Sequence, residues 1–243
     1  MPSGHAVETA FGEHMRHEGP AGHGGLLRDV ILGGQDGIVN VLGVLLGVAQ
    51  ATRDSRIVLV AGLATTFAES VSMAAVAYTS AKAEKEFYQK ELAREKMEMK
   101  HFPHIETEEI RQIYKKKGFR GRRLEFIVKA ITSNDDAWLM TMMSEELGLP
   151  QDRSDPLRSS ATVGFSALAG SLVPLWPFFF FAAAEAMAAS IATSAVVLFA
   201  AGAYKARMTV GDWHIKGLEL AGIGMASALA GYFVGSLFGV AGA

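Results

Sequence analysis

Apolar residues gather in three blocks along the chain, at 30–51, 57–81 and 157–241, and a highly charged segment separates the second block from the third. A helix needs about 20 apolar residues to cross a bilayer, and each block is at least that long. Polar links and the Pro174–Pro177 turn divide the blocks into separate helices. The resulting spans fall at about 30–51, 57–81, 159–174, 178–204 and 217–240. The pattern therefore predicts an all-α polytopic membrane protein with five transmembrane helices.

The charged segment, 82–156, holds 15 of the 25 acidic residues, so the net charge of −2 conceals a sharp partition along the chain. The sequence pattern of this segment is also typical of helices. The second span is expected to continue to about Met99, and shorter helices to follow up to Lys117, over 121–132 and over 135–147. Ser133-Asn134-Asp135-Asp136 is an N-cap cluster for the last of these. The predicted organisation is a polar tail at 1–27, spans one and two within 28–81, a helical polar domain at 82–156, and spans three to five within 157–243.

The distribution of basic residues predicts the orientation. Fourteen Lys and Arg residues lie between Lys82 and Lys129, whereas the opposite side of the membrane has only Arg53 and Arg56. Short loops rich in Lys and Arg stay in the cytoplasm. We therefore expect the N-terminus and the charged domain to be cytoplasmic and the C-terminus to lie outside.

The absence of cysteine excludes disulfides, thiolate metal sites and cysteine nucleophiles. The first 25 residues lack the basic start and apolar core of a secretory signal. They contain four histidines, whose spacings of 9, 3 and 6 fix no common metal geometry, and we expect this tail to be disordered. These histidines are His5, His14, His17 and His23.

Two polar pairs interrupt the first two spans. Asp36 and Asn40 lie four residues apart in the first span, and Glu69 and Met73 lie four apart in the second, so each pair shares a helix face. A carboxylate in hydrocarbon costs roughly 2.5–3.5 kcal/mol, which indicates a functional role. If the faces meet, metal ions and protons would compete for one buried pocket, and this competition is the basis of cation/proton exchange. The alternative is that the carboxylates only satisfy backbone or cap donors.

Glutamates and methionines at helical spacing mark a second candidate metal site. The candidate ligands are Glu95, Glu98, Glu106, Glu109, Met142, Met143 and Glu146. Carboxylates combined with thioethers suit Fe²⁺, Mn²⁺, Co²⁺ or Zn²⁺ better than Mg²⁺ or Ca²⁺. The alternative is a solvated helix face, in which Glu91 pairs with Arg94 and the methionines belong to the core. Glu185, in the fourth span, is equally compatible with an exit vestibule and with a dimer contact.

Together these motifs resemble the vacuolar iron transporter (VIT) family over nearly the full length of the chain, from about Arg28. The matching pieces are Arg28-Asp29, Asp36-Gly37, Gly62-Leu63-Ala64, Ser72-Met73, the Glu-rich helix extension, Met142-Met143 with Glu146-Leu147-Gly148-Leu149, Asp155-Pro156 and Leu172-Val173-Pro174-Leu175. The resemblance implies a homodimer with a path between its subunits, which exports Fe²⁺, and often Mn²⁺, from the cytosol in exchange for protons. It also implies that Asp36 and Met73 form the membrane metal site and that the seven candidate ligands form a cytoplasmic metal-collecting domain.

One departure from the family pattern affects the membrane site. The family often has a glutamate directly after Gly-Leu-Ala, where this chain has Thr65, and the carboxylate comes one turn later as Glu69. A shift of four residues keeps the side chain on the same face but moves it about 6 Å along the axis. Either Glu69 substitutes for the family glutamate or the proton coupling differs.

The sequence therefore predicts a metal/proton antiporter and not an enzyme, with Asp36, Glu69, Met73 and Asn40 on the transport pathway. We expect no permanently bound cofactor, no nucleic-acid partner, and a prokaryotic plasma membrane, since no organelle-targeting segment is evident. One alternative is a membrane-anchored iron-storage or ferroxidase-like di-metal protein. Di-iron bundles use two Glu-x-x-His pairs, and segment 82–156 has one, Glu98-Met99-Lys100-His101. Another alternative is a metal sensor that never translocates ions.

Overall fold

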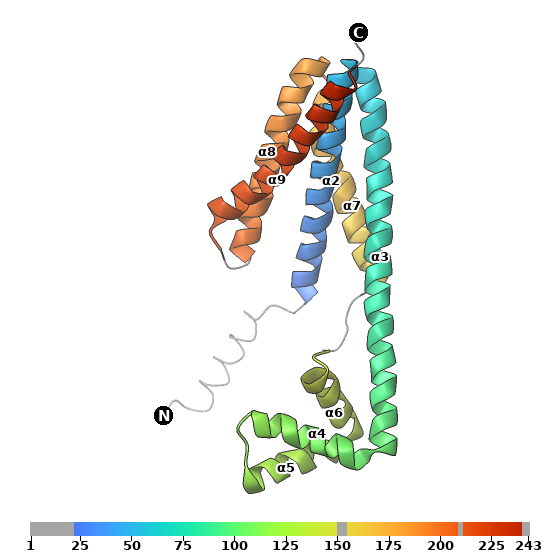
Figure 1. Cartoon of the computed structure of the whole chain (residues 1–243), viewed down its shortest axis with the longest axis vertical. Helices are drawn as coiled ribbons and strands as arrows, with labels where there is room; N and C mark the ends of the chain where they lie inside the picture. Colours follow the sequence, from blue (N-terminus) through green and yellow to red (C-terminus); the bar gives the residue numbers. More distant parts are fainter. Residues whose placement is uncertain (1–21, 150–154, 209–210, 240–243) are drawn as a thin grey trace, which may run out of the picture. The chain divides into compact units, whose positions relative to one another are not determined.

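Five long apolar helices dominate the computed structural model, which describes residues 22–149, 155–208 and 211–239 (Figure 1). All five are long and apolar enough to cross a membrane. They are α2 (Gly22–Thr52), α3 (Ser55–His101), α7 (Pro156–Leu175), α8 (Ala183–Met208) and α9 (Trp213–Leu237). The predicted all-α fold with five spans is thus confirmed. His5, His14 and His17 of the predicted tail lie outside the described residues.

The chain divides into two compact units. One comprises residues 1–78 and 157–243, and the other comprises residues 79–156. Helix α3 runs through the boundary as one uninterrupted helix of 47 residues. Its sequence has neither Gly nor Pro after Gly62, so nothing in it breaks the backbone hydrogen-bond ladder.

Within the larger unit, small residues bring α2 and α9 into close contact. A Cβ atom added at Gly231 would lie 1.9 Å from the carbonyl oxygen of Gly43, and one at Gly235 would lie 2.1 Å from that of Gly47. Ser227 Oγ, on the same face of α9, donates a hydrogen bond of 2.8 Å to the carbonyl of Val39. Membrane helices associate through such small faces because lipid provides no hydrophobic driving force between them.

The boundary between the third and fourth spans differs from the prediction. Helix α7 continues through Pro174 to Leu175, a 3₁₀ turn follows over Trp176–Phe179, and α8 begins only at Ala183. The prediction started the fourth span at Phe178, which is too early. The aromatic run forms a turn because Pro177 lies at the beginning of the 3₁₀ segment, where its missing N–H leaves no bond unmade.

In the smaller unit, three short helices follow the end of α3: α4 (Pro103–Lys116), α5 (Gly121–Thr132) and α6 (Asp135–Thr141) (Figure 1). Asn134 caps α6, as its position in the cap cluster predicts, and its side chain accepts a 3.0 Å hydrogen bond from the N–H of Ala137. The core consists of Ile110, Leu124, Val128, Trp138 and Met142.

The last predicted helix, 135–147, is not a single α-helix. After α6 the chain forms a π-helical turn over Met142–Glu146. The N–H of Leu147 bonds to the carbonyl of Met142, five residues back, at 3.2 Å. This wider turn changes which side chains face the rest of the unit, and π turns of this kind are frequent at functional sites.

Candidate functional site

Three glutamates from three separate elements converge in the smaller unit. Glu95 lies on α3, Glu106 in the first turn of α4, and Glu146 at the end of the π turn. One carboxylate oxygen from each lies within 4.8 Å of the other two. We refer to these three residues as the carboxylate triad. Such a separation allows one ion to be bound by all three groups.

Two members of the triad are almost fully buried. Glu95 is 1% exposed and Glu106 is 4% exposed. Within the part of the chain that the structure describes, one oxygen of each, Oε2, has no hydrogen-bond partner. A buried carboxylate oxygen without a partner costs free energy, and this cost is removed if a cation or a proton binds there.

The turn between α3 and α4 brings Glu106 to Glu95. Phe102 ends α3, with its N–H bonded to the carbonyl of Glu98 at 2.7 Å, and Pro103 begins α4. Proline is well suited to the first position of a helix because its N–H would have no intrahelical partner there. Helix α4 leaves the end of α3 at a steep angle (Figure 1), and Glu106, in its first turn, has a carboxylate oxygen within 4.8 Å of one of Glu95.

The π turn separates the methionines from Glu146. Met142 and Met143 are both buried, and Met142 packs in the core of the unit with Ile110 and Trp138. Glu146 instead reaches the triad. The triad thus consists of carboxylates, and ligation by Met142 and Met143 stays a prediction.

The electrostatics of the site favour a bound cation or bound protons. Burial, followed by the charges of Glu109 and Glu95, raises the pKa of Glu106 to about 7. The same causes in the same order raise the pKa of Glu146 to about 7. Burial also raises the pKa of Glu109, with Glu95 and Glu98 contributing. At neutral pH, Glu106 and Glu146 are therefore each about half protonated, and a metal ion would displace these protons.

Arg94 supplies the positive charge nearest to the triad. Its guanidinium group forms ion pairs of 2.6 Å with Glu91, 3.1 Å with Glu95 and 3.5 Å with Glu98. The sequence suggested only the pair with Glu91. The pairs with Glu95 and Glu98 were not predicted, because Arg94 can reach several glutamates on its own helix and the sequence does not say with which of them it pairs. Arg94 therefore offsets part of the negative charge of the acidic cluster.

The larger unit brings together polar residues of the first two spans. Asn40 Nδ2 on α2 donates a 2.9 Å hydrogen bond to Glu69 Oε1 on α3. The carboxyl group of Asp36 lies within hydrogen-bonding reach of the same glutamate. Two carboxyl groups at this separation can share a proton or a cation. Asp36 and Glu69 are half-buried and Asn40 is exposed, so these polar groups are partly accessible in a single chain.

The remaining predicted residues lie around this pocket or apart from it. Met73 is half-buried, one helical turn beyond Glu69 on α3. Thr65, at the family's glutamate position, donates its hydroxyl to the Ala61 carbonyl of its own helix at 2.8 Å. Glu185 is exposed in the first turn of α8, and both of its suggested roles stay predictions.

One residue of interest was missed by the sequence reasoning. Thr66 is 1% exposed, lies three residues before Glu69, and its hydroxyl has no hydrogen-bond partner among the described residues. A threonine in an apolar span carries no distinctive pattern, since most bond to their own helix.

Comparison with known proteins places these two sites in a family context. A family model described as the VIT family matches residues 27–236. Vacuolar iron transporter 1 of Oryza sativa subsp. japonica is 35% identical over 226 residues, covering 90% of this chain and 89% of its own. Vacuolar iron transporter 1 of Arabidopsis thaliana is 31% identical, with 93% and 90% covered. A vacuolar iron transporter of Plasmodium berghei is 29% identical, with 75% and 71% covered.

Proposed function

The chain belongs to the VIT family, and from that premise we propose that it exports Fe²⁺ and Mn²⁺ from the cytosol in exchange for protons. As a multi-pass membrane protein of a transporter family, it moves metal ions across a membrane and is not an enzyme. The choice of metals, the proton coupling and the direction of transport are the proposal.

The expected prokaryotic plasma membrane is not borne out. The relatives are vacuolar iron transporters from plants and from Plasmodium. The lack of an evident targeting segment was a poor guide, because a transmembrane helix can itself direct insertion into many different membranes.

The carboxylate triad is the observation that carries the proposal. Three glutamate oxygens within 4.8 Å of one another, two of them on buried residues, form a compact site with a high density of negative charge. Oxygen ligands of this kind suit Fe²⁺ and Mn²⁺. We infer that the triad, with Glu98 and Glu109 beside it, collects these ions. Met142 and Met143 would then act from the core side, by stabilising the turn that carries Glu146 or by ligation.

The pocket at Asp36, Asn40 and Glu69 supports proton exchange. A metal ion that binds between the two carboxyl groups displaces their protons, and protons that bind there release the metal. Transport follows if the two exchanges take place on opposite sides of the membrane. Met73, one turn further on, would provide a softer ligand along the path. Because Asp36 and Glu69 are only half-buried and Asn40 is exposed in a single chain, we also propose a homodimer whose second subunit covers them.

Proteoliposomes test the proposal. Purified full-length protein, reconstituted with an imposed pH gradient, should take up Mn²⁺ at a rate that rises with the gradient and falls to background in Asp36→Ala and Met73→Ala. Glu219→Gln is the matched control, since Glu219 is exposed and paired with Lys216 at 2.8 Å, away from the pocket. If either pocket variant transports as well as the parent, the assigned site is wrong.

The carboxylate triad is also compatible with an alternative function, that of an iron-storage or ferroxidase-like protein. Its one Glu-x-x-His pair offers little support, because the His101 ring is bonded through Nδ1 to the Met97 carbonyl of its own helix at 2.8 Å. Oxygen consumption on addition of Fe²⁺ would favour this function, and metal binding without flux would favour a sensor. Proton-driven flux without oxygen consumption would favour transport.

A further inference from the structure

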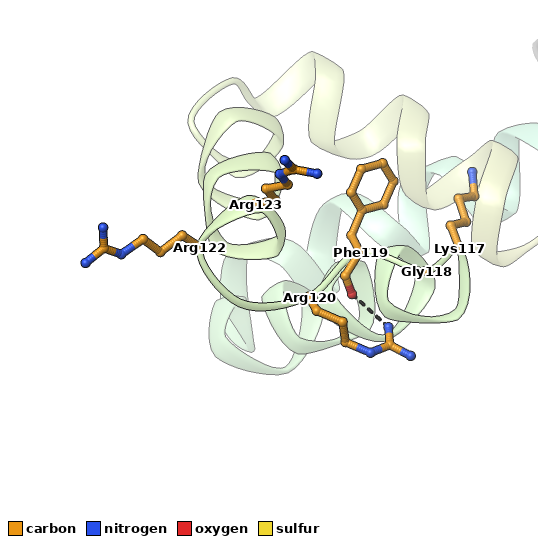
Figure 2. Close-up of a pocket in the computed structure, with 6 residues that line it drawn as sticks. All are labelled: Lys117, Gly118, Phe119, Arg120, Arg122 and Arg123. Atoms are coloured by element: carbon orange, nitrogen blue, oxygen red, sulfur yellow. Dashed lines mark hydrogen bonds between the residues drawn. The ribbon is translucent and has the colours of Figure 1, made fainter.

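A strongly basic surface surrounds the turn between α4 and α5. The sequence from Lys115 to Arg123 contains six basic residues in nine positions and no acidic residue. A cavity of about 510 Å³ lies at this turn, lined by Lys117, Gly118, Phe119, Arg120, Arg122 and Arg123 (Figure 2). We refer to Lys115–Arg123 as the basic turn.

Some of these cations already have partners. Lys117 forms a 2.5 Å ion pair with Glu145. Arg120 donates to the carbonyls of Lys115 and Phe119 and so closes the end of α4, as its bond to Phe119 in Figure 2 shows. These contacts give the turn a defined shape. Lys117 and Arg120 therefore have a structural role in the turn.

The other four cations are exposed. Among the described residues, Lys115, Lys116, Arg122 and Arg123 form no ion pair. The nearby acid on α5, Glu125, is already paired with Arg111 at 3.0 Å. The basic turn therefore presents a net positive charge to its surroundings.

The beginning of α5 adds to this charge. The N-cap position is occupied by Arg120, whose side chain makes no capping bond, and the first turn has no acidic residue. It carries Arg122 and Arg123 instead. Positive side chains at the positive end of a helix are unfavourable, because the free N–H groups there attract anions. A bound anion would offset both the unmade cap and the repulsion.

Exposed aromatic rings lie next to these cations. Phe119 is 37% exposed, and Phe126, one turn after Arg122 on α5, is 75% exposed. The opposite face of α5 is anchored by Leu124 and Val128 in the core, so Phe126 has no core to enter. Cations combined with exposed aromatic rings match a surface that offers phosphate groups above hydrocarbon.

We propose that the basic turn, with Phe126, docks onto the headgroups of anionic phospholipids. A lipid bilayer is the occupant these features fit best. Its phosphates match the four free cations and the uncapped helix start, and its acyl region accepts the phenyl rings. The docking does not depend on the proposed metal transport.

A single-cysteine label can detect the docking, because the chain has no native cysteine. Ala130→Cys places the label on exposed α5, one turn after Phe126. The full chain, carrying an environment-sensitive fluorophore there, is reconstituted in nanodiscs of phosphatidylcholine alone or with about 30% phosphatidylserine. We expect the emission to shift to the blue, and to be quenched by spin-labelled acyl chains, only with phosphatidylserine.

Charge variants identify the surface. Each basic residue at an anionic membrane contributes about a fivefold change in binding, so Arg122→Gln/Arg123→Gln should lower the docking equilibrium about 25-fold. Lys96→Gln/Lys100→Gln removes the same charge from exposed positions on α3 and should change it less than twofold. Unchanged tryptophan emission in a Trp176→Phe/Trp213→Phe background, where it reports buried Trp138 alone, checks that the unit is folded. Equal losses in both double variants would overturn the proposal, since they would indicate a diffuse effect of net charge.

Free anions provide the other arm of the test. Millimolar inorganic phosphate is added to nanodiscs of phosphatidylcholine alone, where no anionic lipid is present. Little change is expected, because phosphate lacks the apolar part that Phe119 and Phe126 would contact. A spectral shift as large as that with phosphatidylserine would assign the basic turn to a soluble anion and overturn docking to lipid. An absence of acyl-chain quenching with phosphatidylserine would overturn it as well.

Discussion

Replacing Glu106 by glutamine should reduce the pH sensitivity of metal binding at the carboxylate triad. Glu106 and Glu146 each have a pKa raised to about 7, chiefly by burial. A divalent ion binds the ionised carboxylates, so binding must release the protons that these two groups hold. As the pH falls through 7, more protons compete with the metal and its affinity decreases. Above about pH 8 both groups are ionised and the affinity levels off.

The size of the effect follows from the two pKa values. Between pH 8 and pH 6, a group with a pKa of 7 weakens metal binding about tenfold, and two such groups weaken it about 100-fold. Glu106→Gln leaves only Glu146 to titrate in this range, so the fall should be about tenfold. At pH 7 the parent should release about one proton per bound ion and the variant about half a proton. The charge of Glu146 contributes to the raised pKa of Glu106, and this coupling is reciprocal. The substitution therefore also lowers the pKa of Glu146 somewhat, and a tenfold fall is the upper limit for the variant.

Calorimetric titration of the full chain in detergent with Mn²⁺ at pH 6, 7 and 8 measures both quantities, since buffers of different ionisation enthalpy report proton release. Glu108→Gln is the matched control on the same helix. Glu108 is exposed, and hydrogen bonds from Gln112 and Arg111 lower its pKa, so it should behave as the parent. A 100-fold fall in Glu106→Gln, or a parent without pH dependence, would refute the assignment of these protons to the triad.

Three further substitutions test the packing and charge of the two units. Arg94→Gln removes the cation that is paired with three glutamates, so the site becomes more negative and its affinity for Mn²⁺ at pH 8 should rise severalfold. If calorimetry finds a weaker affinity, Arg94 instead holds the ligands in place. Gly231→Ala puts a Cβ 1.9 Å from the Gly43 carbonyl oxygen and should abolish the monodisperse peak in size-exclusion chromatography, whereas Gly222→Ala, where nothing lies within 4 Å, should elute as the parent. Asn134→Ala removes the cap of α6 and should lower its opening free energy in hydrogen exchange by about 1 kcal/mol, and Asn134→Asp should restore it.

Several features of this protein could be read from local sequence alone. Hydropathy defined the five spans, because a helix in lipid must be apolar over about 20 residues whatever it packs against. The uninterrupted α3 follows from the absence of Gly and Pro after Gly62, and the start of α6 follows from Asn134. The spacing of Asp36 with Asn40 placed them on one face of their helix, since a turn takes 3.6 residues. The asymmetry of Lys and Arg gave a prediction of orientation that no contact within the chain can test.

The composition of the metal site was decided by tertiary structure. Glu95 and Glu98 are three residues apart and similar in sequence context, yet the triad includes Glu95, which is 1% exposed, and not Glu98, which is only half-buried. The π turn sends Met142 into the core and Glu146 to the carboxylates, although both were expected on one helical face. Helical spacing fixes only which side chains on one helix are neighbours. Tertiary packing decides which helix faces meet and where a helix widens by one residue, because the side chains of several helices must fill the core together. The residues that determine this packing lie far apart in the chain.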